Sequence, residues 1–244
     1  GKPMHRLVST FAAIGLLSVA ILSPPASAQE TDFYFWGVQF EELEYRLGDT
    51  GEELGVWNGD AFFGNDELKL RWLGQGEYDL KASKFEKLEN RLVLQTPVSD
   101  FFDVKAGVRL DTPKGESRWY GVVGLTGLAK QWVEVDADMF LSEKGDASAR
   151  LDAEYELLLT NRVILTPSAD LNVAFSDDRE MGVGRGFSSA ELGLRLSYDL
   201  VDRTVAPYIG AVWERKFGRT ADFARDEGED VEAWLFAVGI RVMF

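Results

Sequence analysis

Hydrophobic and polar positions alternate along most of this chain, and residues 234–244 show the pattern most clearly. One side of this segment carries only large apolar residues: Trp234, Phe236, Val238, Ile240, Val242 and Phe244. The other side is mixed and includes the small Ala237 and Gly239 and the charged Arg241. Because side chains of a β-strand alternate between two faces, a period of two predicts a strand. Large apolar residues on one face and mixed residues on the other are typical of a membrane barrel, with lipid outside and a lumen inside.

The same alternation recurs in twelve segments that are separated by turn residues. We predict strands at 34–46, 53–63, 66–75, 84–96, 101–112, 117–129, 131–142, 147–160, 162–175, 188–200, 204–217 and 232–244. The turns at one end are short, whereas 177–187 and 218–230 at the other end are long and charged, as in outer-membrane barrels. The predicted fold class is all-β, an antiparallel up-and-down transmembrane β-barrel of about 12 strands. A soluble β-sandwich fits less well, because its outer faces would need to be polar.

Two of these segments refine the assignment of the faces. In 188–200 the outward positions include Leu192, Leu194 and Leu196, and the inward positions include Glu191 and Arg195. A lysine or arginine that faces lipid near the midplane costs roughly 2–4 kcal/mol, so this separation indicates which side meets lipid. In the first strand the apolar phase changes at the Glu41–Glu42 pair, which predicts a β-bulge there.

The N-terminal region has the features of a secretory signal. Lys2, His5 and Arg6 precede an apolar run at 7–22, and Ala26 and Ala28 form an A-x-A cleavage pattern. The run is shorter than the roughly 20 residues of a spanning helix. We predict a cleaved signal peptide at 1–28, a short lead at 29–33 and the barrel at 34–244.

The composition excludes several classes of function. The chain has 41 acidic and 26 basic residues and a net charge of −15, which argues against nucleic-acid binding. It contains no cysteine, so it has no disulfide or thiolate metal site. The single histidine, His5, belongs to the predicted signal, so a Ser–His–Asp triad and a histidine-ligated zinc site are excluded from the barrel. We therefore expect a protein that is not an enzyme.

Twelve strands enclose a lumen too wide to be filled by apolar side chains, so functional side chains are expected to line it. The inward charges are densest on the segments 131–142 and 147–160. A hairpin centred near residue 144 places Asp136 opposite Asp152 and Glu134 opposite Glu154, and the next strand brings Asp170 beside Asp152. We take these five carboxylates as candidate metal ligands: Glu134, Asp136, Asp152, Glu154 and Asp170. Other inward charges form a candidate lumen network: Arg91, Arg109, Asp138 (opposite Arg150), Arg150, Glu156, Glu191, Arg195 and Arg241.

This arrangement admits two interpretations. Like charges directly opposite each other on a sheet are destabilising, so the acids need compensation. The inward arginines could supply it, giving an acid–base network that fills and stiffens the lumen. Alternatively, a cation site or path lies among the carboxylates, although oxygen ligands alone do not select copper over Ca²⁺ or Mg²⁺. Methionine adds little, since Met139 faces outward and Met181 lies on an outer loop.

Several long stretches resemble one known family. They are 124–160 (GLTGLAKQWVEVDADMFLSEKGDASARLDAEYELLLT), 188–200 (SSAELGLRLSYDL), 206–231 (APYIGAVWERKFGRTADFARDEGEDV), 35–49 and 56–64. On these stretches the chain resembles the outer-membrane copper resistance protein B family. The resemblance implies a barrel in the bacterial outer membrane that serves copper homeostasis, with copper ions as substrate or transient ligand and commonly a periplasmic multicopper oxidase as partner. Sequestration, export through the barrel and docking all remain open as mechanisms.

The chain also departs from that family's pattern. Many members carry a long Met- and His-rich segment between signal and barrel, whereas only QETD (29–32) precedes the first predicted strand here. We therefore expect no tightly bound cofactor. The expected function is an outer-membrane copper-resistance barrel whose acidic lumen binds or passes copper ions out of the periplasm. The alternatives are a structural or docking barrel for a periplasmic copper-handling partner, with a lumen closed by Arg–carboxylate pairs, and a small-solute porin.

Overall fold

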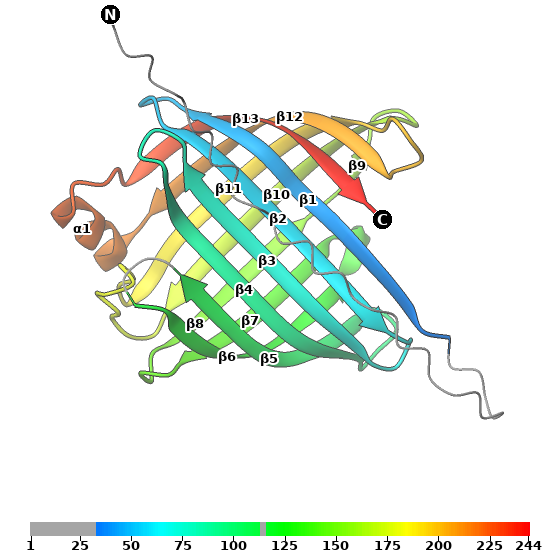
Figure 1. Ribbon diagram of the computed structural model, residues 1–244, viewed down its shortest axis with the longest axis horizontal. Helices are drawn as coiled ribbons and strands as arrows, with labels where there is room; N and C mark the ends of the chain where they lie inside the picture. Colours follow the sequence, from blue (N-terminus) through cyan, green and yellow to red (C-terminus); the bar gives the residue numbers. More distant parts are fainter. Residues whose placement is uncertain (1–32, 113–115) are drawn as a thin grey trace, which may run out of the picture. The chain divides into compact units, whose positions relative to one another are not determined.

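The computed structural model of the protein describes residues 33–112 and 116–244. The predicted signal peptide (1–28) and residues 29–32 of the lead lie outside the described residues, so the predicted domain division stays a prediction. The described chain forms one antiparallel sheet (Figure 1). The last strand pairs with the first, and β10 pairs with β11, so the sheet closes on itself.

Every predicted strand is present, with ends that differ by a few residues. The strands are β1 (Phe35–Gly48), β2 (Glu53–Gly64), β3 (Lys69–Asp79), β4 (Lys84–Pro97), β5 (Phe102–Thr112), β6 (Arg118–Leu128), β7 (Glu134–Ser142), β8 (Ala147–Glu154), β9 (Leu157–Leu158), β10 (Val163–Ala174), β11 (Gly186–Tyr198), β12 (Val205–Lys216) and β13 (Glu232–Met243). The described residues also contain two helices: the 3₁₀ helix η1 (Lys130–Trp132) and the α-helix α1 (Gly218–Asp226).

The barrel has twelve strands because β8 and β9 are two halves of one strand, the segment predicted as 147–160. Both halves pair with β10, and the interruption at Tyr155 and Glu156 lies beside Pro167. The backbone N–H of Tyr155 donates to the carbonyl of Pro167 at 3.1 Å. Proline has no N–H to donate in return, so one bond of the ladder is missing at this point. The predicted twelve-stranded barrel is confirmed, with this break as a local correction.

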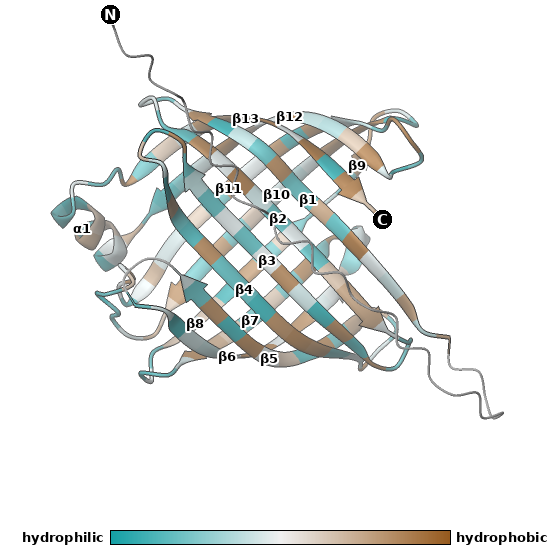
Figure 2. Ribbon diagram, in the orientation of Figure 1, coloured by the Kyte–Doolittle hydropathy of each residue, from teal (hydrophilic) through white to brown (hydrophobic). Residues whose placement is uncertain are grey.

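The two faces of the barrel wall differ as the alternation predicts. Figure 2 shows apolar and polar residues alternating along the strands. On β11, Leu192, Leu194 and Leu196 are exposed on the outside of the barrel, whereas Arg195 is buried. The outward face therefore offers lipid an apolar surface, and the charges of the wall lie in the lumen.

The predicted bulge in the first strand is present. The register of β1 against β2 shifts between Phe40 and Glu42, and its register against β13 shifts between Phe40 and Leu43. A bulge inserts one residue and changes the phase of the faces. As a result the consecutive Glu41 and Glu42 both line the lumen.

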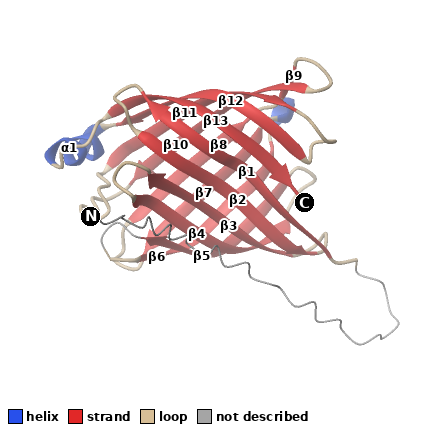
Figure 3. Ribbon diagram, turned by 45° about the horizontal axis from the view of Figure 1, so that its top comes forward, coloured by secondary structure: helices blue, strands red, loops and turns tan. Residues whose placement is uncertain are grey.

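The helices lie at opposite ends of the barrel (Figure 3). The 3₁₀ helix η1 occupies a short turn, where the sequence predicted that a strand would start at residue 131. The helix α1 occupies the long connection at 218–230, where the sequence predicted a loop. No helix in the described part of the chain is long and apolar enough to cross a membrane.

The two long connections pack against each other at the end of the barrel that carries α1. The guanidinium groups of Arg179 and Arg219 lie 5.1 and 5.6 Å from the ring of Phe223 on α1. The backbone N–H of Gly184 donates to the hydroxyl of Thr220 at 2.9 Å. Cation–π contacts and hydrogen bonds therefore hold the 175–185 connection and α1 together.

The 175–185 connection is also anchored to the barrel wall by a buried arginine. Arg118, at the start of β6, forms ion pairs with Asp178 and, at 2.7 Å, with Glu180. Lys144 of the β7–β8 hairpin contacts Glu180 at 2.5 Å. Ion pairs thus attach the 175–185 connection to β6 and to the β7–β8 hairpin.

We expect acid to loosen this connection. The hydrogen bond from Lys144 lowers the pKa of Glu180, and the hydrogen bond from the Arg185 backbone N–H lowers the pKa of Asp177. A lowered pKa contributes stability that is present above the ordinary carboxyl pKa, about 4, and is lost as the pH falls through the lowered value. Pepsin should therefore cut within 175–185 faster as the pH falls from about 4.5 to 3, after correction for the enzyme's own pH profile.

The variant Arg118→Gln should loosen the same connection at neutral pH, where trypsin can report it by cleavage after Arg179 and Arg185. The exposed pair between Arg225 and Asp222 provides a control, since Arg225→Gln removes an arginine from the same end of the barrel without touching the anchor. Equal trypsin rates for both variants would mean that Arg118 does not hold the connection.

Candidate functional site

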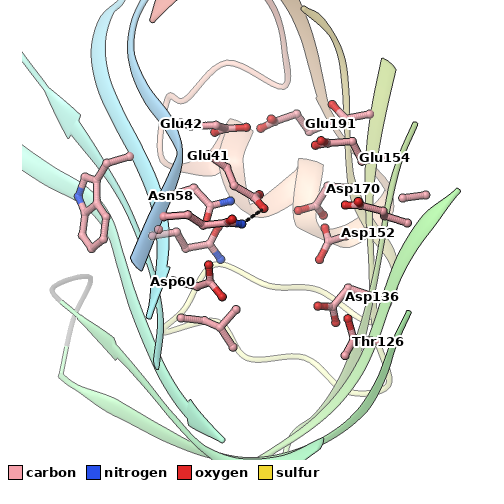
Figure 4. A pocket seen from close by; sticks show the side chains of 18 of the residues that line it. Glu41, Glu42, Asn58, Asp60, Thr126, Asp136, Asp152, Glu154, Asp170 and Glu191 are labelled. Atoms are coloured by element: carbon pink, nitrogen blue, oxygen red, sulfur yellow. Dashed lines mark hydrogen bonds between the residues drawn. The ribbon is translucent and has the colours of Figure 1, made fainter. Parts of the chain in front are cut away.

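A cavity of about 490 Å³ lies inside the barrel, and its lining is strongly acidic. Ten carboxylate side chains line it: Glu41, Glu42, Asp60, Glu77, Glu134, Asp136, Asp152, Glu154, Asp170 and Glu191. Only four basic side chains do so: Arg46, Arg71, Lys87 and Arg91. Figure 4 shows acids of β1 and β2 on one wall and acids of β7, β8, β10 and β11 on the other, directed toward the space between them.

The predicted aspartates form part of a longer row across the wall. Asp136 pairs with Asp152, Asp152 with Asp170, Asp170 with Glu191, and Glu191 with Glu214, so five neighbouring strands each contribute one acid. The register also places Glu134 opposite Glu154 and Asp138 opposite Arg150, as the sequence predicts. We call these five residues the acidic row: Asp136, Asp152, Asp170, Glu191 and Glu214.

Basic side chains compensate the two ends of the acidic row but not its middle. Lys105 forms an ion pair with Asp136, and Arg46 lies 3.3 Å from Glu191 and 3.0 Å from Glu214. In the described part of the chain, neither Asp152 nor Asp170 forms an ion pair with a basic side chain; Asp170 accepts a hydrogen bond from the Asn172 amide at 2.6 Å. The centre of the row is therefore the part that basic side chains leave uncompensated.

A buried network crosses the lumen on one side of the barrel. Glu89 on β4 is 1% exposed and accepts two hydrogen bonds from Arg150 on β8, at 2.9 and 3.1 Å. Arg91 and Arg109 each lie 3.1 Å from the same carboxylate, and Arg91 also contacts Asp138 at 2.7 Å. Strands β5, β6 and β7 separate β4 from β8 in the sheet, so this contact spans the interior.

A second buried network joins β1 to β11 and β12. The Glu44 carboxylate accepts hydrogen bonds from Arg46 at 2.5 Å, from Arg195 at 3.0 and 3.1 Å, and from the Tyr208 hydroxyl at 2.6 Å. Arg46 is 2% exposed. Paired in this way, the buried charges compensate one another. Of the ten acids that line the cavity, all but Asp60 are only partly buried or exposed.

A third contact crosses the lumen near the short turns. Arg241 on β13 lies 3.1 Å from Glu154 and 3.1 Å from Glu156. All of the charges that the sequence places in the lumen network are thus found inside the barrel. Arg91, Arg109, Asp138, Arg150 and Arg195 are buried, and Glu156, Glu191 and Arg241 are half-buried.

The candidate metal ligands lie along one wall instead of around one point. Within residues 33–112 and 116–244, no three Asp, Glu, His or Cys side chains come close enough together to hold a metal ion. Metal binding by Glu134, Asp136, Asp152, Glu154 and Asp170 stays a prediction. Met139 is exposed on the outside of the barrel, and Met181 lines a second cavity of about 290 Å³ near the long connections.

Several lumen residues were not predicted from the sequence. They include Glu41, Glu42, Glu44, Arg46, Asp60, Arg71, Glu77, Lys87, Glu89, Lys105, Arg118 and Glu214. Alternation carries a signal for some of them, since Glu89 shares its face with Arg91, and Lys105 shares its face with Arg109. For Glu41 and Glu42 the signal is the bulge itself, because an inserted residue lets two successive side chains reach the same side.

A model of the family described as "Copper resistance protein B precursor (CopB)" matches residues 34–244. The chain is 37% identical over 204 residues to the copper resistance protein B homolog of Pseudomonas syringae pv. tomato, covering 84% of this chain and 68% of that protein. It is 37% identical over 207 residues to the copper resistance protein B of Escherichia coli, covering 85% of this chain and 69% of that protein.

Solved structures of two porins are similar to the barrel. KdgM porin matches with a TM-score of 0.50 and 11% identity, over 85% of this chain and 99% of its own. NanC porin matches with a TM-score of 0.50 and 12% identity, over 84% and 98%. At such identities the likeness concerns the fold alone.

Proposed function

Since this chain belongs to the copper resistance protein B family, we propose that its acidic lumen binds or passes copper ions out of the periplasm. The protein is a β-barrel of the bacterial outer membrane, with a fold like that of porins. A copper ion is then cargo or a transient ligand and not a resident cofactor. A periplasmic multicopper oxidase, the partner implied by the family resemblance, is part of the same proposal.

One observation carries this proposal, the uncompensated centre of the acidic row. A lumen lined by ten carboxylates and four basic side chains attracts cations and repels anions. Asp152 and Asp170 are the acids of the row without a basic partner in the described residues, so a passing cation would be their counter-ion. Carboxylates bind borderline metals less firmly than imidazole or thiolate does, which suits release as well as capture.

A second candidate function is favoured by the two buried networks. Contacts from Glu89 to Arg150 and from Glu44 to Arg195 cross the interior and narrow it. If they close the lumen, the barrel serves as a structural or docking partner for a periplasmic copper-handling protein. Conductance across a planar bilayer separates the alternatives: a closed barrel conducts nothing, a cation path conducts with cation preference, and a small-solute porin conducts with little preference.

Copper tolerance tests the proposed function in cells. A deletion strain would be complemented with the wild-type gene or with a variant in which Glu134, Asp136, Asp152 and Glu154 are changed to Gln or Asn. We expect the wild type to restore growth on copper and periplasmic copper efflux, and the variant to lose most of both, because the negative lining is removed.

A matched control removes the same number of charges outside the lumen, by changing the exposed Asp66, Glu67, Asp100 and Asp222. Assembly of every barrel is checked first by heat-modifiable gel mobility. If the lumen variant restores tolerance as well as the control does, the acids are scaffold and the proposed path is wrong.

A further inference from the structure

Arg241 occupies a distinctive place in the lumen, at the end of the barrel that carries the short turns. On β13 it pairs with Ala206, which follows the short β11–β12 turn, and β13 ends two residues later at Met243. Glu156 lies in the β8–β9 interruption, just before the short connection at 159–162. Short turns mark the periplasmic end of such barrels, so this contact lies at the periplasmic entrance.

The side chain of Arg241 reaches across the lumen. In the sheet, β13 is separated from β8 by β12, β11 and β10, so contacts at 3.1 Å to Glu154 and 3.1 Å to Glu156 can form only through the interior. Glu154 lines the central cavity, whereas neither Arg241 nor Glu156 does. The contact therefore forms the periplasmic boundary of the acidic cavity.

The contact differs from the two buried networks in a way that bears on function. Arg46 and Glu89 are almost completely buried, but the side chains of Arg241, Glu154 and Glu156 are 23%, 28% and 32% exposed. A half-exposed ion pair exchanges partners at little cost, because water can solvate the separated charges. Arg203 from the adjacent turn lies 3.6 Å from Glu156 and can take over part of its charge.

We infer that Arg241 is the entry-controlling residue of the lumen, a tethered cation that an entering metal cation must displace from Glu154 and Glu156. This inference rests on the proposed function, because it concerns how cargo enters the same acidic cavity. When the guanidinium moves aside, the carboxylates of Glu154 and Glu156 can bind the incoming cation. The cation can then pass on to the acids that line the cavity. An anion cannot displace Arg241 in this way, because the carboxylates of Glu154 and Glu156 repel it.

The test is conductance and Mg²⁺ block in planar bilayers, with Mg²⁺ as a hard divalent probe. In Arg241→Gln we expect a larger K⁺ conductance, a reversal potential shifted toward cation selectivity, and Mg²⁺ block on the order of tenfold tighter, since two carboxylates lose their fixed counter-charge. Arg241→Lys keeps the charge and should behave like the wild type.

Arg71→Gln is the matched control. Arg71 is another arginine of the lumen; it lines the cavity and pairs at 2.6 Å with Asp60 of the neighbouring strand, so its contact does not cross the lumen. If Arg71→Gln and Arg241→Gln change conductance and block equally, Arg241 contributes only charge and the inference is overturned. No change in Arg241→Gln overturns it as well, while a cation-selective wild type still supports the proposed function.

Two further outcomes are informative. If Arg241→Gln does not assemble, the double variant Arg241→Gln, Glu156→Gln removes the contact while keeping the net charge of the three residues, and conductance should still rise. A wild type that is closed while Arg241→Gln conducts supports entry control and counts against a constitutively open path. If every variant is closed, both the inference and the proposed path fail.

Discussion

Replacing Glu89 by glutamine is expected to destabilise the barrel by about 3–5 kcal/mol, the range found when one partner of a buried ion pair is removed. The Glu89 carboxylate is 1% exposed and lies within 3.1 Å of the guanidinium groups of Arg91, Arg109 and Arg150. Glutamine keeps the size of the side chain but not its charge, so three buried cations lose the anion that they share. Urea unfolding of the barrel in lipid vesicles, followed by tryptophan fluorescence, measures the change.

Glu86→Gln on the same strand is the control for this prediction. Its side chain is half-buried, 33% exposed, and pairs at 3.0 Å with Lys84, which is 63% exposed. A pair that water reaches contributes at most about 1 kcal/mol, so Glu86→Gln should be close to the wild type. A Glu89 variant that unfolds at the same urea concentration as the Glu86 variant would show that the arginines find other partners.

The fold was predictable strand by strand because lipid imposes a strict rule on one face. An outward position such as Leu194 must be apolar, and an inward one such as Arg195 need not be, so alternation identifies both the strand and its orientation. The rule also located the bulge at Glu41–Glu42, where alternation fails. The break before Leu157 was not predicted, because it depends on a proline of the neighbouring strand, Pro167.

The candidate site was predictable only where partners lie on adjacent strands. A short hairpin fixes the register of β7 against β8, which is why the pairs Asp136–Asp152 and Glu134–Glu154 were found. Alternation does place Glu89 inside the barrel, but its contact with Arg150 crosses the lumen, and the partner of such a contact depends on how the whole barrel closes. The same limit hid the Glu44–Arg195 contact. The helix α1 was missed because polar residues such as Arg219 and Asp222 made its segment look like a loop.

The acidic row leads to the second large effect: Asp152→Asn combined with Asp170→Asn should make the barrel more stable and less selective. The two aspartates take part in three like-charge neighbour pairs, with Asp136, with each other and with Glu191. Each such pair destabilises a sheet by roughly 0.2–1 kcal/mol, so removing both charges should stabilise the barrel by about 1–2 kcal/mol. The cation preference in bilayers should fall toward equal permeability for K⁺ and Cl⁻.

The opposite signs of these two effects separate the interpretations of the lumen. If the acids were only part of a stiffening network, each would be compensated by an arginine, and its removal would cost stability. Asp152 and Asp170 lack such a partner in the described residues, so the repulsion between their carboxylates lowers the stability of the barrel. Destabilising arrangements of this kind are retained where function requires them.

Urea unfolding and the reversal potential, measured on the same Asp152→Asn, Asp170→Asn variant, distinguish the two interpretations of the acidic row. The double variant Asp66→Asn, Glu67→Gln is the exposed control. A variant that loses stability and keeps its selectivity would assign the row to the scaffold, whereas a gain in stability with a loss of selectivity would assign it to the passage of cations.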